Sequence, residues 1–100
     1  MGSGNKSPKV IQLIGTGASI ECDLPDFKPR IVEAVNVASG DRLEWFEGMT
    51  NAHAVKTLGA TGAVSIITSL GITIRDKGFT LGADTDVNVA GEALRVVCFE

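Results

Sequence analysis

The segment 84–88 (DTDVN) carries the one carboxylate cluster whose spacing suits a metal ion. Its oxygen-bearing side chains alternate as they do at the start of an EF-hand calcium loop. The match ends early, because Val89 stands at the sixth position in place of glycine and Arg95 at the twelfth in place of glutamate. Short polar side chains commonly accept hydrogen bonds from nearby backbone N–H groups and so fix a turn. We therefore expect Asp84, Asp86 and Asn88 to be structural, with weak calcium binding as the alternative, and we predict no cofactor.

The remaining groups with catalytic potential do not form a recognisable site. His53 is the only histidine, so the chain lacks the second such ligand that a transition-metal site would use. Neither Cys22 nor Cys98 has a sequence-level case for a histidine partner, and no G-x-S-x-G motif is present. Both cysteines lie at apolar positions of predicted strands, which favours buried free thiols. We predict a protein that is not an enzyme.

The stretch around Trp45 and Phe46 is a candidate contact surface. If it is a strand, one of these two aromatic rings must point away from the core. Aromatic residues and methionine are enriched in protein interfaces, so Met49 belongs to the same prediction. We add Lys9 and Val10, from the first predicted strand, as further interface candidates. Glu44 and Glu47 flank Trp45 and leave a carbohydrate-binding site as an alternative, although such residues more often form the solvated side of a strand.

The elements that must position these residues are short strands separated by turns. Alternation of apolar and polar residues, with Gly, Pro, Asn and Asp between the runs, predicts about eight strands and an antiparallel β-sandwich or flattened barrel. Lys9–Gly15 and 18–23 are expected to form a hairpin through Gly15-Thr16-Gly17. For residues 48–62 a loop followed by a strand at Ala54–Leu58 is favoured over a short helix ending at Leu58. The other predicted strands are 30–38, 42–47, 63–68, 72–75, 79–83 and 92–99.

Composition limits the class of protein. The chain has 100 residues, 44% of them hydrophobic, with a mean hydropathy of +0.21. So small a domain cannot bury all of these side chains, which predicts a surface covered by other copies of the chain. A net charge of −3 without a basic run argues against nucleic acid as a partner. No segment has the length and hydropathy of a membrane span or secretory signal. We expect a flexible N-terminal arm at 1–8, a single domain at 9–100, and synthesis in a reducing cytoplasm.

The chain from Phe27 onward resembles a group of small structural proteins from the virions of tailed bacteriophages. The shared pattern is a Phe-Lys-Pro lead-in, a W-x-x-G-M stretch, an I-T-S-x-G-I hairpin and a closing G-F-T-L-G-x-D-x-x-V-N-x-x-G-E-x-L run. It lies here at 27–29, 45–49, 67–72 and 78–94. The final strand, 95–99 (RVVCF), departs from the aromatic-rich ending of the group.

The resemblance implies a protein that decorates or cements the capsid shell. The expected partners are the major capsid protein and further copies of the chain, most simply in a trimer. The expected location is the virion, assembled in the host cytoplasm. A tail- or fibre-associated structural module is an alternative within the same class. In either case we expect Leu94, Val96 and Cys98 to face the core and Val97 and Phe99 to lie on the opposite side of the closing strand.

Overall fold

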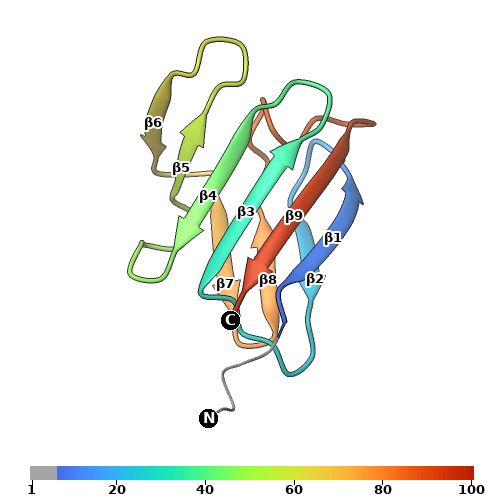
Figure 1. Ribbon diagram of the computed structural model, residues 1–100, viewed down its shortest axis with the longest axis vertical. Helices are drawn as coiled ribbons and strands as arrows, with labels where there is room; N and C mark the ends of the chain where they lie inside the picture. The colour runs from blue at the N-terminus through green and yellow to red at the C-terminus, as the bar shows by residue number, and fades with distance from the viewer. Residues whose placement is uncertain (1–6) are drawn as a thin grey trace.

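A computed structural model describes residues 7–100, which fold into nine β-strands and no helix (Figure 1). The predicted arm at 1–8 lies outside these residues, apart from Ser7 and Pro8, which are both exposed. Within residues 7–100, no helix is long and apolar enough to cross a membrane. The strands are β1 Lys9–Ile14, β2 Ile20–Asp23, β3 Ile31–Asn36, β4 Arg42–Phe46, β5 Ala54–Thr57, β6 Val64–Ile67, β7 Ile72–Arg75, β8 Gly78–Leu81 and β9 Ala93–Phe99.

The strands form two antiparallel sheets, which confirms the predicted sandwich and not the barrel. The larger sheet has six strands in the order β1-β9-β3-β4-β5-β6, and the smaller has three in the order β2-β8-β7. In Figure 1 the smaller sheet lies behind β3, β9 and β1, while β5 and β6 extend to one side. The larger sheet therefore has an inner face toward the smaller sheet and an outer face turned away from it.

The expected hairpin between the first two strands is wrong. β1 pairs with β9 in the larger sheet, whereas β2 pairs with β8 in the smaller one. The turn around Gly15-Thr16-Gly17 therefore carries the chain from one sheet to the other. Gly15 suits this passage because a Cβ there would lie 2.1 Å from the carbonyl oxygen of Val89. A tight turn of small residues is equally compatible with a hairpin and with a sheet-to-sheet connection, so local sequence could not decide between them.

The core lies between the sheets and follows the alternation of the strands. Leu94, Val96 and Cys98 of β9 are fully buried, as predicted for the closing strand. β9 lies between β1 and β3, so both of its edges are paired. Phe27, in the loop between β2 and β3, is 1% exposed and fills one end of the core. The core is thus mainly aliphatic, and the central strand β9 contributes three of its fully buried residues.

One local prediction concerns residues 54–58, which the sequence left open between a strand and a short helix. Ala54–Thr57 is strand β5, so the choice of a loop and a strand over a short helix is confirmed. Gly78 begins β8 with a φ of +136°, which glycine adopts without the strain that a side chain would add. A Cβ at Gly78 would also lie 2.0 Å from the carbonyl oxygen of Cys22 on the neighbouring strand. The close pairing of β2 and β8 therefore depends on glycine at this position.

Candidate interaction surface

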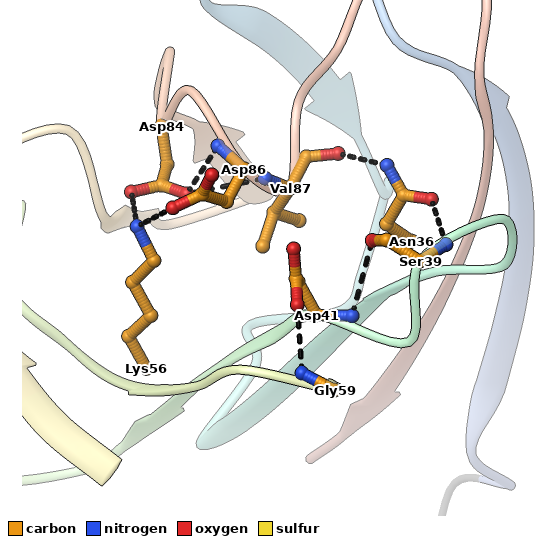
Figure 2. A network of polar contacts seen from close by, with 8 residues as sticks. All are labelled: Asn36, Ser39, Asp41, Lys56, Gly59, Asp84, Asp86 and Val87. Atoms are coloured by element: carbon orange, nitrogen blue, oxygen red, sulfur yellow. Dashed lines mark hydrogen bonds and ion pairs between the residues drawn. The ribbon is translucent and has the colours of Figure 1, made fainter. Parts of the chain in front are cut away.

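The carboxylates of the DTDVN segment surround a lysine from β5 (Figure 2). The Lys56 Nζ atom lies 2.9 Å from Asp84 Oδ1 and 2.7 Å from Asp86 Oδ2. Asp84 Oδ2 accepts hydrogen bonds from the backbone N–H groups of Asp86 and Val87. Burial alone would lower the pKa of Lys56, but its bonds to Asp86 and Asp84 and their charges outweigh burial and raise it. The cluster thus holds an ammonium group and fixes a turn.

Asn88 points to different partners from the two aspartates. Its Oδ1 accepts from the N–H groups of Thr16 and Gly17, and its Nδ2 donates to the carbonyls of Ala18 and Gly82. The side chain is 1% exposed and joins the connection between β1 and β2 to the residues after β8. The three oxygen-bearing residues therefore do not converge on one point. Within residues 7–100, no group of three or more His, Cys, Asp or Glu residues could hold a metal ion.

Asn36 is a buried polar residue that the sequence analysis did not single out. Its Nδ2 donates to the Val87 carbonyl at 3.1 Å and its Oδ1 accepts from the N–H group of Ser39 (Figure 2). Nδ2 also donates to Glu92 Oε1 at 2.8 Å, and Oδ1 also accepts from the Ala38 N–H group. Asn36 and Lys56 together fix the segment between β8 and β9 against the inner face of the larger sheet. An asparagine at the end of an apolar strand gave no spacing signal for this role.

The two cysteines are buried free thiols, as predicted. Cys22 comes from the smaller sheet and Cys98 from the larger, and both belong to the core. Burial raises the pKa of the Cys98 thiol to about 12, and the nearby Cys22 adds to this effect. Burial also raises the pKa of Cys22, against an opposing effect of the Arg75 charge. A thiol that stays protonated is a poor nucleophile.

The aromatic pair of β4 divides between the two faces, as strand geometry requires. Trp45 is 6% exposed and its Nε1 donates to the Thr50 carbonyl, whereas Phe46 is 40% exposed on the outer face. Met49 is half-buried and packs against the core. Because Glu44 is on the outer face and Trp45 points inward, these residues do not form one carbohydrate platform. Trp45 instead helps to line a hollow of about 260 Å³ with Glu47 and Met49.

The two candidates on β1 also differ from each other. Val10 is 67% exposed and lies on the outer face, paired in register with Val97. Lys9 is exposed but points to the inner side, where its Nζ lies 5.7 Å from the centre of the Phe27 ring. A cation over an aromatic ring is a favourable contact within the chain. Of the predicted interface residues, Val10 and Phe46 are therefore the two that share the outer face of the larger sheet.

The outer face gathers the apolar side chains that the core leaves out. Among residues 7–100, strand alternation and register place seven of the nine exposed large hydrophobic residues on it. Half-buried Val35, Val55 and Val97 lie among them. Exposed apolar surface is a feature of interaction sites, which makes the outer face the candidate interaction surface. The seven are Val10, Ile14, Ile31, Phe46, Val64, Ile66 and Phe99.

Charged residues occupy the centre of the same face, in two neighbouring rows across the strands. Glu33 and Glu44 lie directly opposite each other on β3 and β4. Arg42 and Arg95 lie in the next row, each paired in register with Val35 of β3. Burial raises the pKa of Glu44, and the hydrogen bond and charge of Glu33 raise it further, while Arg42 opposes them. Among residues 7–100, none of these four side chains has an ion-pair partner within 4.0 Å.

One end of the outer face is hollowed. Ile31, Phe46 and Phe99 line a depression of about 420 Å³ together with Arg30, Glu47 and Glu100. Arg30 and Glu47 form an ion pair at its rim, with the Arg30 Nη2 atom 3.0 Å from Glu47 Oε1. The three apolar side chains are cross-strand neighbours in the register of β9, β3 and β4. Their cluster gives the face an apolar end beside its charged centre.

Comparison with known proteins gives no relative for this chain: no protein-family model, curated protein or solved structure matches it.

Proposed function

We propose that this chain is a non-enzymatic structural protein of a tailed-phage virion, most specifically one that decorates the capsid shell. The observation that carries the proposal is the outer face of the larger sheet, with its seven exposed apolar side chains. A surface of this kind is stabilised by contact with other chains in an assembly. The sequence pattern shared with virion proteins directs the proposal to the capsid and to the major capsid protein as partner.

The free edges of the larger sheet support assembly of the chain into a homo-oligomer, with a trimer as the proposed state. β1 and β6 are the outermost strands of this sheet. Successive antiparallel pairing of six strands makes β1 and β6 run in opposite directions. β6 of one copy can therefore continue the sheet of the next by pairing antiparallel with its β1. Such a head-to-tail contact closes into a ring where the rotation between copies is a three-fold one, as in the proposed trimer.

Reconstitution on capsid shells tests the proposal. Purified protein is added to shells made of the major capsid protein alone, and bound protein is measured by co-sedimentation and by the resistance of the shells to heat. We expect saturable binding and a higher disruption temperature. Binding to isolated tails but not to shells would instead favour the tail-associated module. Failure to bind either particle would contradict the proposed function.

A pair of substitutions tests the part played by the outer face. Phe46→Asp places a charge in its apolar end, where burial against another chain would desolvate the new carboxylate. We expect binding to shells to weaken about tenfold or more. Leu70→Asp is the matched control, because Leu70 is 49% exposed and lies in the turn between β6 and β7. Equal binding by the two variants would assign the contact to another surface.

A further inference from the structure

The charges at the centre of the outer face are complementary to a second copy of the same face. Glu33 and Glu44 form one row across β3 and β4, and Arg42 and Arg95 lie one row further along the strands. From this pattern we propose that two copies of the chain pack their outer faces together about a two-fold axis. The axis runs across the strands, between the row of Glu44 and the row of Arg42. This inference rests on the proposed function and assigns the outer face to contact between copies of the chain within the assembly that binds the shell.

The axis determines which residues meet. Rotation about it lays β4 of one copy over β4 of the other, running in the opposite direction. Glu44 then faces Arg42 of the second copy, and Arg42 faces its Glu44. Arg95 on β9 lies beside the second copy's Glu33, because β9 and β3 are neighbouring strands with registered rows. All four charged side chains thus gain an ion-pair partner that they lack among residues 7–100 of their own chain. Charged pairs removed from water are strong determinants of orientation.

The same charges disfavour the other simple way of stacking the sheets. A two-fold axis parallel to the strands, placed between β3 and β4, would set Glu33 of one copy over Glu44 of the other. That arrangement would add carboxylates to a place where two already lie opposite each other. Like charges brought together at an interface disfavour that arrangement. The charge pattern therefore selects the axis across the strands.

The apolar residues of the face also fit the selected axis. Ile66 of β6 meets Val64 of the second copy at one side of the sheet, and Val10 of β1 meets Gln12 at the other. At the hollowed end, Phe99 of one copy lies over the small side chain of Ala93 of the second copy. A bulky ring against a methyl group is the kind of complementarity that packed sheets use. Apolar contacts thus lie at the β6 side and the hollowed end of the charged centre.

The size of the face is sufficient for a specific contact. Six strands spaced about 4.8 Å apart and five residues long span about 29 by 17 Å, or about 500 Å² in plan for each copy. The two copies together would then bury about 1,000 Å², the lower bound for a specific interface. The contact leaves edges β1 and β6 free, so it is compatible with the proposed trimer.

A charge-swap experiment tests the pairing directly. Glu44→Arg sets arginine against Arg42 of an identical partner, and Arg42→Glu sets glutamate against Glu44. Each variant alone is expected to lose face pairing by about tenfold or more. A mixture of the two variants restores opposite charges at both positions, so the variants should bind each other. Glu44→Arg/Arg42→Glu within one chain should also restore pairing of the chain with itself.

Capture on a tag separates face pairing from any contact through the sheet edges. Tagged Glu44→Arg protein is incubated with untagged Arg42→Glu protein or with untagged Glu44→Arg protein. Edge contacts capture both equally, whereas face pairing captures the Arg42→Glu protein at least about tenfold more. Equal capture, or a double variant that does not self-associate, overturns the inference. Asp76→Arg and Lys77→Glu, exposed in the turn between β7 and β8, are the matched charge controls and should behave as the wild type.

The outcome is independent of the shell-binding test of the proposed function. Variant-selective capture without binding of the wild-type protein to shells or tails would support the two-fold contact and contradict the virion role. Shell binding with equal capture of the two variants would support the virion role and overturn the two-fold contact. Thermal unfolding of each variant establishes that the exposed substitutions leave the fold intact.

Discussion

Lys56 supplies the positive charge that balances the carboxylates of Asp84 and Asp86. The spacing of the DTDVN segment had suggested calcium for this role. Its ammonium group bonds both Asp84 and Asp86, and the lysine and Asp84 side chains are only 13% and 7% exposed. Asp84 also receives two backbone N–H bonds, which position its carboxylate. A buried charge that loses its partner is costly, because the remaining ion is still out of water. The cluster is therefore a structural ion pair whose disruption has a measurable cost.

Lys56→Met is expected to lower the free energy of unfolding by about 3 kcal/mol, since it leaves the buried Asp84 carboxylate unbalanced. The difference in unfolding free energy between the variant and the wild type should become smaller at high pH. Because the pKa of Lys56 is raised in the folded protein, its contribution is complete below the ordinary lysine pKa of about 10.4 and is lost as the pH rises further. Urea titrations between pH 7 and 11 measure both effects. Exposed Lys77→Met is the control, and equal destabilisation by the two changes would contradict the role of the pair.

Glu44→Gln should stabilise a single chain at neutral pH by about 0.2–1 kcal/mol, because it removes one of two carboxylates that lie directly opposite each other. The raised pKa of Glu44 means that its ionisation costs folding free energy as the pH rises above the ordinary glutamate value. The gain should therefore disappear below about pH 4. Denaturation at low protein concentration tests this, with Glu47→Gln as control. Glu47 pairs with Arg30, so its removal should give no gain.

The segment between β8 and β9 acts as a connector between the two sheets. Asn88 makes four hydrogen bonds from this segment, three of them to the turn between β1 and β2. Asn36 holds the Val87 carbonyl from β3, on the larger sheet. Val87 is itself fully buried in the core. The connector thus closes the inner side of the sandwich with polar contacts at its ends and an apolar residue between them.

Asn88→Ala is expected to cost about 2–3 kcal/mol of unfolding free energy, since it removes the four hydrogen bonds of a side chain that is only 1% exposed. The amide hydrogen of Thr16 should also exchange faster with solvent. Asn51→Ala is the matched control, because exposed Asn51 accepts a single bond, from the Ile74 N–H group. A loss no larger than that of the control would show that solvent satisfies the freed groups.

Strand alternation allowed the elements and the core to be predicted from sequence, but not the pairing of the first two strands. Alternate residues of β9 lie on opposite faces of the sheet, so the inward-facing residues Leu94, Val96 and Cys98 could be predicted from the local sequence. The choice between a hairpin and a sheet change after Gly15 depends on β8 and β9, more than fifty residues away. The partner of Asp84 likewise lies 28 residues away, at Lys56. The spacing of the carboxylates suggested a cation at this cluster, but it could not predict that the cation is the side chain of Lys56.

At the scale of the molecule, the unequal sheets explain why an apolar chain has an apolar surface. Three strands cover one side of a six-stranded sheet, and no second layer covers the other side within residues 7–100. The inner face becomes the core, while the outer face retains Val10, Phe46 and Ile66 in contact with solvent. The excess of hydrophobic residues thus follows from the architecture. It supplies the surface that the proposed assembly would bury.

The two thiols report directly on the separation of the sheets, because Cys22 and Cys98 lie in the core on opposite sheets. Fully buried Cys98 has its pKa raised to about 12, so the folded protein should hold almost no reactive thiolate at pH 8. Its reaction with a disulfide reagent should be at least about a thousandfold slower than in the unfolded chain, since it requires the core to open. Cys22, 8% exposed on edge strand β2, should react faster. Cys22→Ser and Cys98→Ser isolate the two rates, and rapid labelling of Cys98 without denaturant would show that the sheets separate more readily than this packing implies.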